Sequence, residues 1–193
     1  MDRNAQRSCS ARQRLLSCTS CPLAITLVAS VILPLWLDWA ASAADVPGRL
    51  RTVLDGDHVD IAAPRMEQAL QLRLLGIDAP DEGQPFWQEA RAFLEHLLAE
   101  KELKVATGRS PRLEAGGRTV ATIVLPDGST ANRSLIMAGL AWVYDEDFRG
   151  DDTDREEFKI LKEQARREKR GLWTDPAPVP PWLYRRLRAG AYP

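Results

Sequence analysis

Residues 70–81 read LQLRLLGIDAPD, an alternating run of apolar and polar residues that passes into a polar end. The alternation from Leu70 to Leu74 has the two-residue period that is typical of a β-strand with one buried face. We therefore expect a strand from Leu70 to Ile77. Asp78 and Asp81 follow this strand, so carboxylates are expected at its end.

Further strands and helices are predicted on both sides of this run. Strands over 49–53 and 59–62 are joined by residues 55–58, Asp-Gly-Asp-His, and aspartate and glycine suit a tight hairpin turn. Other strand-like segments are 101–107, 118–125 and 140–144, and helices are expected over 84–100, over 132–139 and between Thr153 and Gly171. Five short strands with inserted helices predict an α+β fold, a five-stranded OB-like β-barrel with about three packed helices.

The first 44 residues have the pattern of a signal peptide. A basic start is followed by an apolar run from Leu23 to Leu37 and by the small residues 41–44, Ala-Ser-Ala-Ala. The run has about 15 residues, fewer than the ~20 that span a bilayer, so cleavage is favoured over an uncleaved membrane anchor. We expect a secreted or periplasmic protein. All three cysteines lie in this leader, so the mature chain has no disulfide and no thiolate metal site.

Charge and length limit what the mature chain can be. Without the leader the net charge changes from −1 to −3, which argues against a broad basic surface for nucleic acid. A polyanion would have to be held locally, by a few arginines or a metal ion. Residues 45–174 are enough for one core, and residues 175–193 are expected to form a proline-rich, basic C-terminal tail. We expect a monomer without a stable protein partner.

Three polar clusters are the candidates for chemistry: residues 55–57 (Asp-Gly-Asp), residues 73–81 and residues 116–118 (Gly-Gly-Arg). Each alone has a structural explanation, since Asp-Gly forms turns and arginines on barrel strands usually face solvent. Together they indicate a site. Asp57 and Asp78 suit a hard cation, calcium first. Arg73 and Arg118 can bind a phosphate, and Asp81 can orient or deprotonate a water.

These clusters resemble the signature blocks of the staphylococcal nuclease (thermonuclease) family. The resemblance extends from about Gly48 to Trp173, and it includes residues 139–144 (Gly-Leu-Ala-Trp-Val-Tyr) and 171–173 (Gly-Leu-Trp). It implies an exported nuclease that hydrolyses DNA or RNA to 3′-phosphate products. It also implies a Ca²⁺ site and catalytic residues, namely Asp57, Asp78 and the backbone carbonyl of Ala79 as metal ligands, and Arg73, Asp81 and Arg118 in catalysis.

The sequence also departs from the family pattern. Asp81 stands where the family has glutamate, Ala115 replaces a lysine, Gly116 replaces a tyrosine, and His58 replaces a common threonine. The carboxylate of Asp81 is retracted by roughly 1.5 Å, so we expect reduced activity. His58 is expected to be a turn histidine facing solvent, with a metal ligand or general base as the alternative.

A second functional class stays open on the sequence alone. The chain can be a catalytically weakened module of the same fold that binds nucleic acid or a protein partner and is held at the membrane by its leader.

Overall fold

The computed structural model describes residues 45–108, 111–114, 116–148 and 152–190. The predicted leader and Ala115 lie outside these ranges. Across the described ranges, no helix combines the length and the apolar character needed to cross a membrane.

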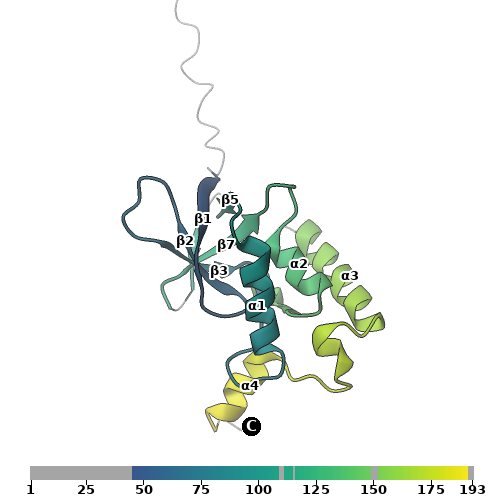
Figure 1. Cartoon of the computed structure of the whole chain (residues 1–193). Helices are drawn as coiled ribbons and strands as arrows, with labels where there is room; N and C mark the ends of the chain where they lie inside the picture. Colours follow the sequence, from purple (N-terminus) through teal and green to yellow (C-terminus); the bar gives the residue numbers. More distant parts are fainter. Residues whose placement is uncertain (1–44, 109–110, 115, 149–151, 191–193) are drawn as a thin grey trace, which may run out of the picture. The chain divides into compact units, whose positions relative to one another are not determined.

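Five strands close into a mixed barrel, as Figure 1 shows. They are β1 (Val46–Val53), β2 (His58–Ala62), β3 (Leu70–Leu74), β5 (Leu103–Ala106) and β7 (Thr119–Val124). β2 pairs with β1 and with β3, β1 also pairs with β5, and β5 pairs with β7, all antiparallel. The parallel pairing of β3 with β7 closes the ring. The predicted OB-like barrel is therefore confirmed.

Four α-helices, three short strands and two 3₁₀ turns surround the barrel in the described ranges. The helices are α1 (Trp87–Leu98), α2 (Ala131–Met137), α3 (Asp152–Arg167) and α4 (Pro181–Arg188). The strand β4 (Ile77–Asp78) pairs with β8 (Trp142–Val143), and β6 (Arg112–Leu113) pairs with β7. The 3₁₀ turns are η1 (Asp145–Asp147) and η2 (Gly171–Thr174). In Figure 1, α1 crosses in front of the barrel, while α2 and α3 lie side by side.

The barrel and α1 share one apolar core. In β2 and β3 the alternate residues Val59, Ile61, Leu72 and Leu74 are fully buried, as the period of two predicts. α1 contributes the buried residues Ala90, Leu94 and Leu98, which are spaced by four and so lie on one helical face. Each large side chain buried in this way contributes about 1.5–3 kcal/mol to stability. This core holds the strand ends in place.

The strand predicted over residues 70–77 is broken at Gly76 into β3 and β4. Gly76 has a φ of +75°, and a Cβ there would lie 2.5 Å from Cζ of Phe148. Only glycine meets both demands without strain. The break turns the chain so that Asp78 leaves the barrel and joins β8. An alternating sequence pattern does not reveal such a bend, because the apolar residues continue across it.

The C-terminal segment is not only a proline-rich tail. Pro181 occupies the first turn of α4, where its missing N–H and fixed φ favour helix initiation. The sequence predicted about three helices, and α4 is the helix that this prediction missed. The strand β6 was also not predicted, since it has only two residues.

Candidate active site

A cavity of about 790 Å³ opens beside the ends of β3 and β4. Its walls come from the β2 start, β3, β4, β6, η1 and α4. Three arginines and five carboxylates make the lining rich in charged groups. The lining residues are His58, Arg73, Asp78, Asp81, Arg112, Leu113, Glu114, Val120, Tyr144, Glu146, Asp147 and Arg185. Three of the predicted site residues, Arg73, Asp78 and Asp81, therefore meet in one cavity.

Arg73 is held rigidly in this cavity. It is buried, and its Nη1 donates to Oδ2 of Asp147 at 2.6 Å while its Nη2 donates to the carbonyl of Ile77 at 3.3 Å. The guanidinium also lies over the Tyr144 ring, 5.2 Å from the centroid. Burial alone lowers the pKa of Arg73, but the contact with Asp147 outweighs this and raises it. Arg73 is a fixed positive charge.

Asp147 organises this side of the cavity. Its side chain is about 9% exposed, and besides Arg73 it accepts from the backbone N–H of Gly76 at 2.9 Å and from Nη2 of Arg112 at 2.8 Å. Nη1 of Arg112 donates to the backbone carbonyl of the same residue at 2.9 Å. One carboxylate from η1 thus fixes two arginines and the turn at Gly76.

The hairpin turn before β2 carries the first predicted metal ligand. Gly56 packs against Ala79, which follows β4, and against Ala90 of α1. A Cβ at Gly56 would lie 2.6 Å from Cβ of Ala79 and 2.7 Å from Cβ of Ala90. Any larger residue would push the turn away. The close approach holds the turn that carries Asp57 against the segment that follows Asp78. Burial is the main cause that raises the pKa of Asp57, and the charges of Asp55 and Asp78 act in the same direction.

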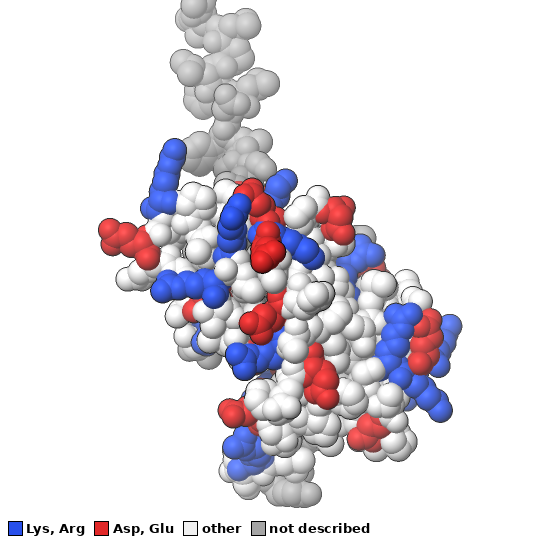
Figure 2. Space-filling view, viewed as in Figure 1, with Lys and Arg blue, Asp and Glu red and all other residues white. Residues whose placement is uncertain are grey.

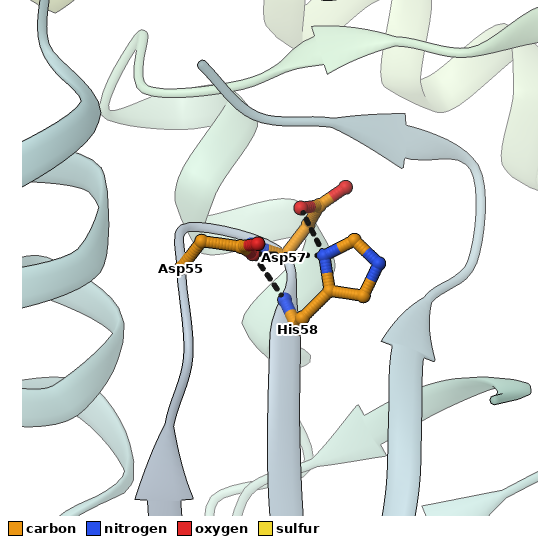
Figure 3. Close-up of side chains that lie close together, drawn as sticks. All are labelled: Asp55, Asp57 and His58. Carbon is orange, nitrogen blue, oxygen red and sulfur yellow. Dashed lines mark hydrogen bonds and ion pairs between the residues drawn. The ribbon is translucent and has the colours of Figure 1, made fainter. Parts of the chain in front are cut away.

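His58 is not a solvent-facing turn histidine, so that expectation was wrong. Its Nδ1 lies 2.8 Å from Oδ1 of Asp55 and 3.0 Å from Oδ1 of Asp57, and its backbone N–H also donates to Asp55. Figure 3 shows the imidazole turned toward these two carboxylates. Burial lowers the pKa of His58, but the two hydrogen bonds outweigh it and raise the pKa to about 10. The two carboxylates therefore favour the protonated form of the ring.

His58 compensates only one of the two carboxylate oxygens of Asp57, the Oδ1 atom that lies 3.0 Å from its ring. Its Oδ2 is buried and has no hydrogen-bond partner among the described residues. Burial raises the pKa of Asp57 to about 7, even though the neighbouring His58 acts in the opposite direction. A buried carboxylate oxygen without a donor suits a metal ion. Ligand atoms of Asp55 and Asp57 lie within 4.8 Å of each other, whereas the protonated ring of His58 can donate hydrogen bonds but cannot bind a cation. The residues present therefore fit a cation at Asp57.

Asp78 and Asp81 are bridged by an arginine from the far end of the chain. Arg185 of α4 donates through Nη2 to Oδ2 of Asp78 at 2.7 Å and through Nη1 to both oxygens of Asp81, at 3.1 and 3.0 Å. The contact with Asp78 raises the pKa of Arg185. Burial raises the pKa of Asp81, although Arg185 opposes this.

The two remaining predicted site residues, Arg118 and Ala79, do not line the cavity. Nη1 of Arg118 lies 3.7 Å from Oε1 of Glu114, and Glu114 in turn lies 3.6 Å from Nε of Arg73. Arg118 is therefore at the edge of the site, behind Glu114, and does not line the cavity. Ala79 is buried against Gly56. The roles of Arg118 in catalysis and of the Ala79 carbonyl in metal binding stay predictions.

The sequence did not point to Asp147, Arg112 or Glu114 as site residues. Asp147 lies in the acidic run 145–147, and Arg185 in the basic run 185–188, and such runs are most often solvated surface. On the face shown in Figure 2, basic and acidic side chains are intermixed and form no continuous basic area. This agrees with local binding of a polyanion at a few residues.

The fold and site together define a class: a small OB-like barrel with arginines and carboxylates gathered in one cavity at the strand ends. The family of the staphylococcal nuclease homologues matches residues 71–175, and the chain belongs to this family. It is 36% identical over 147 residues to an uncharacterized endonuclease of Escherichia coli O157:H7, covering 76% of this chain and 90% of the relative. It is 35% identical over 176 residues to a micrococcal nuclease of Shigella flexneri (87% and 91% covered). It is 31% identical over 172 residues to the protein ParB of Escherichia coli (85% and 87% covered).

Proposed function

We propose that this chain is an exported, monomeric nuclease that hydrolyses phosphodiester bonds of DNA or RNA with the help of calcium and leaves 3′-phosphate ends. The observation that carries the proposal is the cavity in which a fixed arginine, Arg73, faces the carboxylates Asp78 and Asp81. The names of two relatives, an endonuclease and a micrococcal nuclease, support it. Export rests on the leader pattern in residues 1–44.

The roles follow from charge and position. Arg73 is fixed by Asp147 and presents its remaining N–H groups to a phosphate, so it can offset the charge that develops on the phosphate oxygens during attack. Asp81 is the carboxylate that orients an attacking water and accepts its proton. Arg118 would reach the phosphate from the edge of the site. A calcium ion held by Asp57, Asp78 and the Ala79 carbonyl would add further positive charge at the phosphate.

The direct test is cleavage of single-stranded DNA by protein recovered outside the cytoplasm. We expect its N-terminus to follow Ala43 or Ala44, and we expect cleavage to rise with calcium and to stop when a chelator removes it. Asp57→Asn should weaken calcium binding at least about tenfold, because the buried oxygen loses its charge. Cleavage that continues undiminished in chelator would contradict the calcium requirement.

A second candidate is a nuclease-fold module that binds nucleic acid with little catalysis. It is favoured by the contact of Arg185 with Asp81, which occupies both oxygens of the proposed base. Oligonucleotide binding with no detectable cleavage at saturating calcium would select this candidate.

The side chain of Asp81 is one methylene shorter than the glutamate of the family pattern, and this difference gives a separate prediction. Asp81→Glu should raise kcat about tenfold, because it extends the carboxylate by roughly 1.5 Å and a misplacement of about 1 Å can cost ~10²-fold. Steady-state kinetics on single-stranded DNA would measure it. The matched control is Glu82→Asp, which changes an exposed neighbour by one methylene and should leave kcat unchanged. A lower kcat in Asp81→Glu would show that the loop already places Asp81 correctly.

A further inference from the structure

The helix α4 is docked on the site by contacts that do not involve Arg185. Pro181 is buried, and the Trp182 ring lies 5.9 Å from the rings of both Trp142 and Tyr144. Nε2 of Gln84 donates to the carbonyl of Val179, just before the helix, at 3.1 Å. These contacts fix the helix against β8 and the loop of Asp81. A change at position 185 should therefore leave α4 in place.

Arg185 uses this position to reach two carboxylates at once. Four hydrogen bonds join its guanidinium to Asp78 and Asp81, and the fork on Asp78 is bidentate. Charge-assisted bonds of this kind are about twice as strong as neutral ones. No other cation of the described residues forms an ion pair with Asp78 or Asp81. Asp78 is almost fully buried, and Arg185 is the cation that compensates its carboxylate among the described residues.

The two ends of the guanidinium differ in their partners. Nη1 contacts both oxygens of Asp81 and also Oδ1 of Asp78 at 3.2 Å, whereas Nη2 contacts only Oδ2 of Asp78. If the short Nη2 bond and the longer Nη1 bond to Asp78 break, the two Nη1 bonds to Asp81 can still hold that carboxylate. A metal ion at Asp78 would be repelled by a guanidinium on the same oxygens, so the two cations compete there.

We propose that Arg185 is a positioning residue of the active site: it holds the Asp81 carboxylate in place from α4, and its contact with Asp78 competes with a divalent cation for that ligand. The proposal rests on the proposed function for the role of Asp81, while the competition at Asp78 can be tested without any cleavage. It makes the C-terminal helix a part of the site.

The test compares Arg185→Ala and Arg185→Lys with the wild type and with Arg186→Ala, which removes the same charge from an exposed position of the same helix. Calorimetric titration with CaCl₂ alone, without nucleic acid, measures cation affinity. We expect Arg185→Ala to bind calcium about tenfold more tightly and Arg186→Ala to match the wild type. Unchanged or weaker binding in Arg185→Ala would overturn the competition.

Kinetics at saturating calcium test the positioning role. We expect Arg185→Ala to lower kcat on single-stranded DNA by about 10–100-fold with KM within about threefold of the wild type, since a carboxylate displaced by about 1 Å costs up to ~10²-fold. Arg185→Lys should recover part of the loss. A kcat that rises in Arg185→Ala would overturn the positioning role and show that α4 inhibits the site. If the wild type itself does not cleave, the proposed function fails, and the calcium titration still decides the competition at Asp78.

Discussion

Arg73→Lys is expected to lower kcat for cleavage of single-stranded DNA by about 10³-fold, since an arginine aimed at a transferring phosphate can contribute that much or more. Lysine keeps the charge, but it cannot contact Asp147, the Ile77 carbonyl and a phosphate at the same time, as the planar guanidinium can. Steady-state kinetics at saturating calcium measure the change. Folding should survive, because the positive charge beside Asp147 remains.

The matched control is Arg51→Lys, which makes the same replacement at an exposed position of β1. It should leave kcat within about twofold of the wild type, since exposed charges away from the site contribute little. If Arg73→Lys keeps kcat within tenfold of the wild type, Arg73 is a structural arginine and the phosphate is held elsewhere.

Asp147→Ala is expected to have the largest effect on stability, a loss of about 3–5 kcal/mol in the free energy of unfolding. The replacement leaves the buried Arg73 with only the longer 3.6 Å contact to Glu114 and removes the acceptor for the Gly76 N–H. An uncompensated buried charge is costly because the protein interior cannot solvate it. Thermal unfolding should show a drop in Tm of at least about 6 °C.

The control for Asp147 lies two residues away on the same 3₁₀ turn. Asp145 pairs with Arg155 at 2.7 Å, but this pair is largely exposed, so Asp145→Ala should cost less than about 1 kcal/mol. The double variant Arg73→Met/Asp147→Ala should lose less stability than the sum of the single losses, because it removes both buried charges. Equal losses in Asp147→Ala and Asp145→Ala would show that the buried pair does not hold η1.

The barrel was predictable because its strands follow local rules. The alternation in residues 70–74 and the Asp-Gly turn at 55–57 depend on neighbours along the chain, and the structure confirms both. The same holds for the helix predicted over residues 84–100, which is observed as α1 from Trp87 to Leu98. Even the position of Asp78 at a strand end followed from these rules, although the bend at Gly76 did not.

The prediction for His58 failed for a physical reason. Its residue type and its place in a turn suggested exposure, but the turn also brings Asp55 and Asp57 within 3.0 Å of the ring. Whether a histidine faces water or two carboxylates depends on side-chain directions that a residue count does not contain.

Local patterning in the amino-acid sequence is sufficient for the strands, the turns and the residue types available for chemistry, since backbone dihedrals respond to near neighbours. The pairing of charges is a property of the folded molecule alone. Asp147 meets Arg73 across 74 residues, and Arg185 meets Asp78 across 107. Electrostatic energy depends on distance in space and on burial, and neither quantity exists until the barrel, η1 and α4 have come together.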